Sequence, residues 1–331
     1  MHRRFAVLST AVVLTVALAP TSTADTSTAD TRAPRPRPAQ QGAADTAAER
    51  RQVLTYWTES RMEAAQPLKA PAPKAGTAGE PERGAPSTAP STALPTRELQ
   101  AARTPGEAWT GGGAVARTTG RVFFTTQGGR NSSCSGTAVT SANKSVVLTA
   151  GHCVKMSGAF HTNWVFVPGY DRGSRPFGTW AATRLLTTPQ WNAREDVNFD
   201  VAAAVVAPLD GRALVDVVGG QGVAFNQPRR RQMYAFGYPA LAPYDGSKLI
   251  HCSGRAFDDF VGTGDLGLTC NMTGGSSGGP WMLNFAESTG LGTLNSVNSF
   301  KYSFAPNWML GPYFGNEAQA VYQSAQTASV L

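Results

Sequence analysis

From Arg121 onward, short runs of β-branched and aromatic residues alternate with turns rich in Gly, Asn, Asp and Pro. Regular spacing of such runs is typical of an all-β sandwich or barrel. We predict strands over residues 121–126, 136–141, 145–150, 163–168, 179–186, 201–207, 232–237, 249–254, 266–272 and 292–300. The C-terminal stretch 316–329 is predicted to be a helix, with Ala318, Val321 and Tyr322 facing inward.

The chain before this β region has a different pattern. Residues 1–24 are predicted to be a signal peptide, because Arg3 and Arg4 precede a short apolar run and Ser22-Thr23-Ala24 offers a cleavage site. The apolar run is short for a membrane span, although a retained anchor is the alternative interpretation. Export places the protein outside the cell, so we expect a secreted, extracellular protein.

Residues 25–117 are rich in Pro and Ala, and we predict a largely disordered prosegment or linker. One stretch within it, 44–66, has Val53, Leu54, Trp57 and Met62 on roughly one helical face. Thr58 is positioned to cap a short helix over 59–65. This stretch is either a transient helix in a linker or a prosegment element that docks on the domain of residues 118–331.

Candidate chemistry centres on the loop Thr273–Trp281, where two glycine pairs flank two serines. Acyl transfer needs an exposed nucleophile with backbone N–H groups aimed at the developing oxyanion. Ser277 is the candidate nucleophile, and the N–H groups of Gly275 and Ser277 are the candidate oxyanion hole. The alternative is a Gly- and Ser-rich turn without chemistry.

Two upstream residues complete a possible triad. His152 ends an apolar strand within Leu148–Cys153, and Asp200 enters the apolar run that continues through Val206. A buried carboxylate needs a partner, and the order His, Asp, Ser is one of the known orders of the catalytic triad. Asp200 could instead cap the strand, and Asp196 is the second candidate for the acid.

These motifs resemble those of the chymotrypsin-type serine peptidases, in particular their secreted bacterial branch. TAGHC, ending at Cys153, matches the histidine motif of that family, and GSSGGP over Gly275–Pro280 matches its serine motif except at Ser276, where animal enzymes carry Asp. The resemblance covers about residues 118–331. It implies an all-β fold of two six-stranded antiparallel barrels with the active site between them, followed by the C-terminal helix.

Four cysteines lie at positions 134, 153, 252 and 270, and four cysteines allow three pairings. Pairing of sequence neighbours gives Cys134–Cys153 and Cys252–Cys270, and the first pair matches the bridge beside the family's histidine. Each bridge would stabilise the fold by about 3 kcal/mol in the chain-entropy model. No CxxC motif occurs, so a metal site is not indicated.

The resemblance also bears on specificity. It places Asn271 at the base of the primary substrate pocket, and the absence of an acid there disfavours Arg or Lys substrates. The glutamate-specific relatives carry a histidine in a pocket-wall strand, whereas the matching strand Leu294–Phe300 has none. We therefore expect uncharged substrate residues in this pocket.

The net charge is +7, and the tightest basic cluster is Arg229-Arg230-Arg231. Nucleic-acid surfaces interleave aromatic residues with such charges, and none lie here. We expect a monomer that acts on polypeptide substrates, with no cofactor, no metal, no nucleic acid and no membrane partner after signal removal. The function expected is that of a secreted serine endopeptidase with a His152-Asp200-Ser277 triad. The alternative is a catalytically weak or inactive peptidase-like module that binds a partner or the cell wall.

Overall fold

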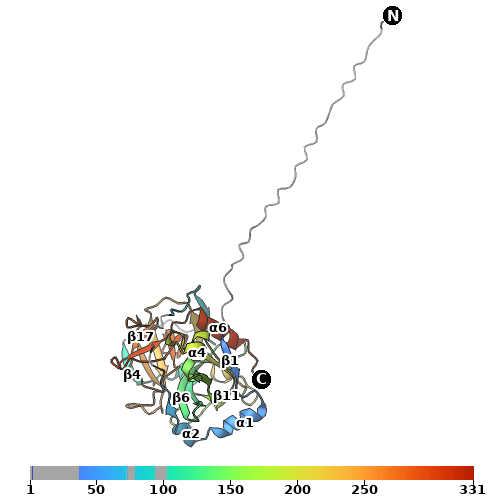
Figure 1. Ribbon diagram of the computed structural model, residues 1–331, viewed down its shortest axis with the longest axis vertical. Coiled ribbons are helices and arrows are strands. Elements are labelled where there is room, and N and C mark those ends of the chain that lie inside the picture. Colours follow the sequence, from blue (N-terminus) through green and yellow to red (C-terminus); the bar gives the residue numbers. More distant parts are fainter. Residues whose placement is uncertain (1, 3–36, 72, 74–78, 94–102) are drawn as a thin grey trace. The chain divides into compact units, whose positions relative to one another are not determined.

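The computed structural model describes residues 2, 37–71, 73, 79–93 and 103–331 (Figure 1). The predicted signal peptide, apart from His2, therefore lies outside the described residues. Within the described part of the chain, no helix is long and apolar enough to span a membrane.

The first half of the β region forms a closed antiparallel barrel, whose strands pair in the order β5-β6-β7-β12-β11-β10, with β10 returning to β5. Its members are β5 (Thr119–Thr125), β6 (Asn131–Val139), β7 (Val146–Thr149), β10 (Thr162–Pro168), β11 (Trp180–Thr187) and β12 (Ala202–Val206). Closure removes the unpaired edges that an open sheet would leave.

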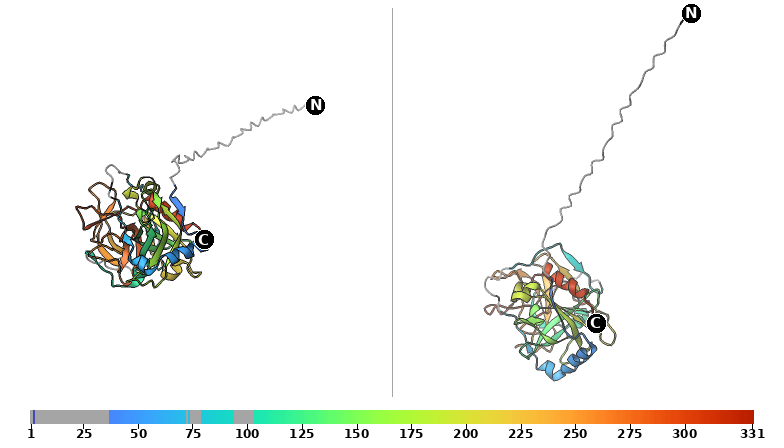
Figure 2. Two further views of the ribbon diagram at one scale, coloured as in Figure 1. Left: turned by 60° about the horizontal axis from the view of Figure 1, so that its bottom comes forward. Right: turned by 45° about the vertical axis from the view of Figure 1, so that its right-hand side comes forward.

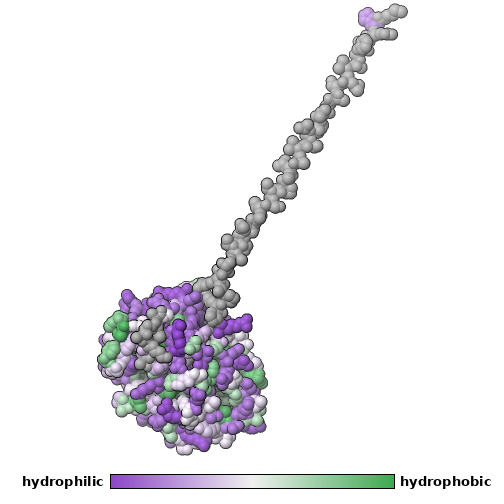
Figure 3. Space-filling view, in the orientation of Figure 1, coloured by the Kyte–Doolittle hydropathy of each residue, from purple (hydrophilic) through white to green (hydrophobic). Residues whose placement is uncertain are grey.

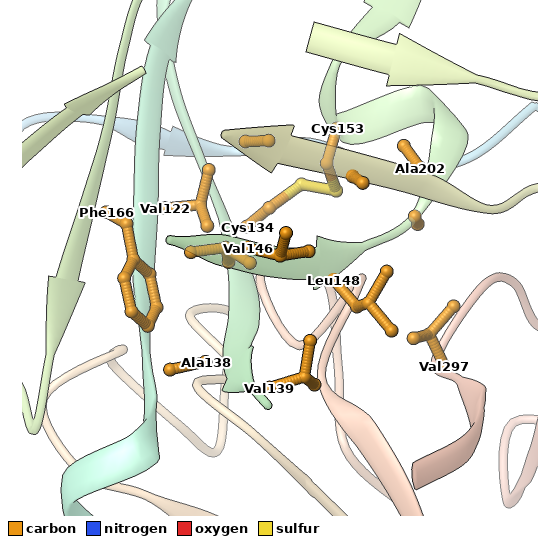
Figure 4. Packing of buried hydrophobic residues seen from close by; sticks show 14 of the residues in the cluster. Val122, Cys134, Ala138, Val139, Val146, Leu148, Cys153, Phe166, Ala202 and Val297 are labelled. Atoms are coloured by element: carbon orange, nitrogen blue, oxygen red, sulfur yellow. A yellow bond between two sulfur atoms is a disulfide. The ribbon is translucent and has the colours of Figure 1, made fainter. Parts of the chain in front are cut away.

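Small and branched apolar side chains fill this barrel. Val122, Val146, Leu148 and Phe166 are essentially unexposed, and Figure 4 shows them around the Cys134–Cys153 disulfide. Because β5 and β7 are buried along their whole length, both faces of these strands are covered. The turn that carries His152, directly after β7, is therefore attached to a buried core.

The second half consists of two sheets. The larger sheet has the order β3-β13-β19-β18-β14-β15-β4, and the smaller one has the order β16-β17-β20. The larger sheet contains β3 (Ser87–Ala89), β4 (Thr104–Ala108), β13 (Gly222–Phe225), β14 (Gln232–Gly237), β15 (Ile250–Arg255), β18 (Pro280–Ala286) and β19 (Leu291–Val297). The smaller one contains β16 (Phe257–Asp258), β17 (Leu266–Thr269) and β20 (Trp308–Gly311). The Cys252–Cys270 disulfide joins the two sheets.

The predicted all-β class and the C-terminal helix are confirmed. α6 (Asn316–Gln326) buries Ala318, Val321 and Tyr322, as its apolar spacing requires. The remaining short elements are α3 (Gly113–Thr118), α4 (Pro189–Arg194), α5 (Leu214–Val218), the pair β8 (Lys155–Met156) and β9 (Ala159–Phe160), and single 3₁₀ turns at Gly151–Cys153 and Val197–Phe199. Among the described strands after residue 118, sequence analysis did not predict β8, β9, β13, β16, β18 or β20.

The segment 25–117 is more ordered than expected in its described parts. It forms α1 (Ala47–Tyr56), α2 (Glu59–Glu63), β1 (Ala39–Gly42), which extends the barrel sheet at β11, and β2 (Gln66–Pro67), which pairs with β6. The strands β3 and β4 of the larger sheet also belong to this segment, and they pair with β13 and β15. Figures 1 and 2 show α1 and α2 alongside the first barrel. Thr58 accepts a hydrogen bond from the N–H of Arg61, so the predicted helix cap is confirmed.

Burial on the barrel explains this order. Trp57, Met62 and Leu68 are each only about 1% exposed. Trp57 contacts Phe123 of β5 and donates its indole N–H to the carbonyl of Asn163. The segment is too poor in apolar residues to build a core of its own, but a few large side chains gain burial on a partner surface. The composition of this segment does not show that the first barrel provides such a surface.

Candidate active site

His152 lies in the 3₁₀ turn Gly151–Cys153, directly after β7, and its side chain is completely buried. The disulfide from Cys153 to Cys134 attaches this turn to β6. Gly151 has no space for a side chain, because a Cβ there would lie 2.7 Å from the Trp191 ring and 2.9 Å from Asp200 Oδ1. The glycine therefore allows His152 and Asp200 to approach closely.

Asp200 precedes β12 and is also completely buried. Its Oδ1 accepts a hydrogen bond of 2.8 Å from the backbone N–H of His152, and its Oδ2 lies 2.8 Å from His152 Nδ1. The Ser299 hydroxyl donates a further hydrogen bond to Oδ2. A carboxylate out of water needs such partners. Sequence analysis missed Ser299, since a serine at the end of a predicted strand carries no local signal.

The second candidate acid, Asp196, has a different role. Its Oδ1 accepts hydrogen bonds from the backbone and side-chain nitrogens of Asn198, and its Oδ2 pairs with Arg194 at 3.2 Å. These contacts cap the 3₁₀ turn Val197–Phe199. The acid that meets His152 in this structure is Asp200.

Ser277 lies in the loop between β17 and β18. The backbone turns through positive φ at Gly275 (+99°) and Gly278 (+78°), which glycine adopts without strain. A Cβ on Gly278 would lie 2.1 Å from Thr149 Oγ1, so the loop packs directly on the end of β7. The Ser277 carbonyl accepts a hydrogen bond of 2.7 Å from Ser135 N–H on β6. The serine and histidine loops thus rest on the same two strands.

Several polar groups in this region have no partner within the described residues. His152 Nε2 is buried and makes no hydrogen bond there, including to the Ser277 hydroxyl. No described group accepts a hydrogen bond from the N–H of Gly275 or Ser277. The neighbouring Ser276 instead donates its hydroxyl to the Thr273 carbonyl at 2.8 Å. Ser276 therefore faces into the loop.

His161 contacts the backbone of the turn that carries His152. Its Nε2 lies 2.9 Å from the His152 carbonyl, and its ring stacks on Phe124 with centroids 4.3 Å apart. Burial lowers the pKa of His161 to about 4, so the ring is neutral near pH 7.

A cavity of about 880 Å³ opens beside Ser277. Asn271 is among its lining residues, and its Oδ1 accepts a hydrogen bond of 2.5 Å from the Tyr244 hydroxyl. Four stretches of the second half line the cavity, namely Leu241–Pro243, Asn271–Gly274 with Ser276 and Ser277, Ser299–Ser303, and Pro306, Asn307 and Met309.

The N-terminal segment also reaches this cavity. Lys69, Ala70, Pro71 and Pro73 line it. Leu68 donates its N–H to the Ser133 carbonyl at 3.0 Å, and Ala70 packs in the apolar cluster of Trp191 and Phe300. We call residues 66–71 and 73 the cover segment. It contributes to the wall of the cavity beside the candidate nucleophile.

Ligand atoms of Cys134, His152 and Cys153 lie within 4.8 Å of one another. Both sulfurs are joined in the disulfide, so they are not available as thiolate ligands for a metal ion.

Two arginines of the basic cluster 229–231 form ion pairs, because Arg229 and Arg230 both contact the Asp258 carboxylate. The face in Figure 3 is mostly hydrophilic with small apolar patches.

No protein-family model and no curated protein matches the sequence. Solved structures do match. The protease Anisep from Arthrobacter nicotinovorans is 43% identical over 67% of this chain and 100% of its own, with a TM-score of 0.63. The thermostable serine protease AL20 from an extremophilic microorganism is 45% identical over 65% of this chain and 100% of its own, with a TM-score of 0.62.

A Glu endopeptidase shares only 17% identity, with a TM-score of 0.52 over 67% of this chain and 97% of its own, and this likeness concerns the fold. The two bacterial proteases match over their entire lengths at more than 40% identity. The chain therefore belongs to the bacterial chymotrypsin-like serine proteases, and its fold supports a peptidase function.

Proposed function

We propose that this protein is a secreted serine endopeptidase that hydrolyses peptide bonds through an acyl-enzyme on Ser277. The observation that carries this proposal is the buried His152–Asp200 pair, with its 2.8 Å contact, on the same strands that hold the Ser277 loop. A histidine oriented by a buried carboxylate, next to a serine at a cavity, is the arrangement that nucleophilic acyl transfer needs.

In the proposed reaction, Ser277 Oγ attacks the carbonyl carbon of the substrate, and its proton passes to His152 Nε2. The free Nε2 supports this role, since no described group occupies it. The tetrahedral intermediate collapses, and His152 donates the proton to the leaving amine. A water then attacks the acyl-enzyme by the same route and releases the acid product. Asp200 holds the Nδ1–H tautomer and stabilises the imidazolium.

The N–H groups of Gly275 and Ser277 are proposed as the oxyanion hole. Neither N–H donates to a described residue, so both are free to donate to a developing oxyanion. Loss of one such donor costs roughly 10²–10³ in kcat. Ser276 and Asn298 hold the loop by donating hydrogen bonds to backbone carbonyls, so all of these groups are neutral. We therefore propose that the loop keeps its shape without an ion pair to a buried ammonium group.

We further propose that residues 1–24 direct export and that residues 25–117 act as a prosegment. Two disulfides fit an oxidising compartment. The cover segment at the Ser277 cavity supports inhibition by obstruction. The cover segment lines this cavity, whereas Trp57, which lies between α1 and α2, anchors the prosegment on the first barrel.

A peptidase-like binding or cell-wall module with weak or no activity is the competing function. Hydrolysis of casein by the secreted chain separates the two. The proposal expects new peptides to appear with the wild type and none with Ser277→Ala. Equal release by both proteins, or none by the wild type even after limited proteolysis within residues 25–117, would refute it.

A further inference from the structure

Lys301 is a charged residue in the wall of the Ser277 cavity. It follows Ser299 and Phe300 directly, and all three line the cavity. Lys301 is the residue directly after the predicted strand Leu294–Phe300, which contains no histidine.

The ammonium group links its own stretch to two neighbouring segments of the chain. Lys301 Nζ donates hydrogen bonds to the Cys270 carbonyl at 2.8 Å and to the Pro306 carbonyl at 2.6 Å. Cys270 immediately precedes the lining residue Asn271, and Pro306 itself lines the cavity. The side chain thus contacts two other segments at or next to the cavity wall.

The charge on this group is not balanced by the described protein. An ammonium group has three donors, and the two carbonyls that it meets are neutral. No described Asp or Glu forms an ion pair with Lys301, and Lys69 and Lys301 are the charged residues among those that line the cavity. Burial lowers the pKa of Lys301 to about 8, so the group is still mostly protonated near pH 7.

A partly buried cation without a counter-charge favours a ligand that brings one. A substrate carboxylate would supply the missing acceptor and the missing charge together, and charge-assisted hydrogen bonds are the strong ones. A basic side chain would be repelled, and an apolar one would leave the cation unpaired. The other lining groups, such as Asn271 and Ser303, are neutral and do not oppose this choice.

We propose that Lys301 selects substrates with an acidic side chain, Asp or Glu, at the residue whose carbonyl is attacked. This inference rests on the proposed peptidase function and replaces the expectation of uncharged substrate residues. If Lys301 only stabilised the cavity wall, its loss would lower kcat/KM for all substrates alike. If its charge selects the substrate, its loss lowers kcat/KM for the acidic substrates in particular.

The test uses fluorogenic peptides that differ only at the residue before the scissile bond, with Glu against Gln and Asp against Asn. The wild type should favour each acid over its amide by on the order of 100-fold in kcat/KM. Lys301→Met should abolish this ratio while amide substrates change only a few-fold. Lys301→Glu should favour Lys substrates over Glu substrates.

Lys155→Met is the matched control. Lys155 is also buried and also donates to a backbone carbonyl, that of Asn192, but it does not line the cavity. Its loss should leave the acid-to-amide ratio unchanged. Mapping of cleavage sites in casein by mass spectrometry gives a second readout of the wild type.

The outcomes separate the two proposals. Hydrolysis by the wild type without a preference for acidic residues overturns the role of Lys301 and leaves the peptidase function standing. A uniform loss over all substrates in Lys301→Met also overturns it. If the variants fail to fold, the wild-type ratio alone decides. Failure of the wild type to cleave any peptide or casein overturns both proposals.

Discussion

The Ser299 hydroxyl donates a hydrogen bond to Oδ2 of Asp200, although 99 residues separate the two in sequence. Asp200 precedes β12 of the first barrel, and Ser299 follows β19 of the second half. Both side chains are buried. The carboxylate that orients His152 is therefore itself positioned by the opposite half of the protein.

Loss of this hydrogen bond should weaken the orientation of His152 without removing the triad. We expect Ser299→Ala to lower kcat about 10-fold with a small change in KM, because one of several partners of a buried charge is lost. Ser299→Thr, which keeps the hydroxyl, should recover most of the activity. Steady-state kinetics measure both variants, and a Thr variant as impaired as the Ala variant would contradict the role of the hydroxyl.

Acid should destabilise the fold through His161. Its pKa is about 4 in the folded protein and about 6.5 when unfolded, so the unfolded state binds more protons between these values. Stability therefore rises with pH through this window and falls as pH drops from about 6.5 to 4.

Urea unfolding of wild type and His161→Gln at pH 7 and pH 4.5 tests this effect. Gln does not titrate, so the stability advantage of the wild type should shrink by about 2 kcal/mol at the lower pH. An advantage that stays the same at both values would show that His161 is not buried in its neutral form.

Each disulfide should join two cysteines that are neighbours in the order of the sequence. Peptide mapping without reduction is expected to recover Cys134 with Cys153 and Cys252 with Cys270. Replacement of Cys252 and Cys270 together by Ala should lower the free energy of unfolding by about 3 kcal/mol. A crossed pair such as Cys134–Cys252 would contradict the arrangement of the two halves.

Release of the cover segment should raise activity. Leu68→Asp places a charge at a position that is about 1% exposed, and Trp57→Ala removes the anchor on Phe123. Each change should weaken docking of the cover segment by several kcal/mol, so hydrolysis of short peptides by the full chain should increase several-fold.

Arg51→Ala serves as the control for these variants, because Arg51 lies on the exposed face of α1. It should leave activity unchanged. If Leu68→Asp and Trp57→Ala retain the wild-type Tm and the wild-type rate, the cover segment does not restrict access to the cavity.

Local patterns predicted the β class, the C-terminal helix and the residues that the structure brings together as His152 and Asp200. The β class and the helix are confirmed, and both were predictable because strand spacing and helical periodicity are local properties. The roles of His152 and Asp200 stay predictions, although the structure places the two side chains 2.8 Å apart. β18 was missed since Pro280 follows two glycines, which are typical of a turn. Ser299, Lys301 and the order of the prosegment depend on partners distant in sequence, and no local pattern reveals such partners.

We propose that Ser277, and not its neighbour Ser276, is the activated nucleophile. A fluorophosphonate probe forms a covalent bond only with an activated serine, and tryptic mapping then locates the modified residue. We predict modification at Ser277 in the wild type and in Ser276→Ala, and none in Ser277→Ala or His152→Ala. Modification at Ser276, or persistent labelling of the Ser277→Ala protein, would contradict it.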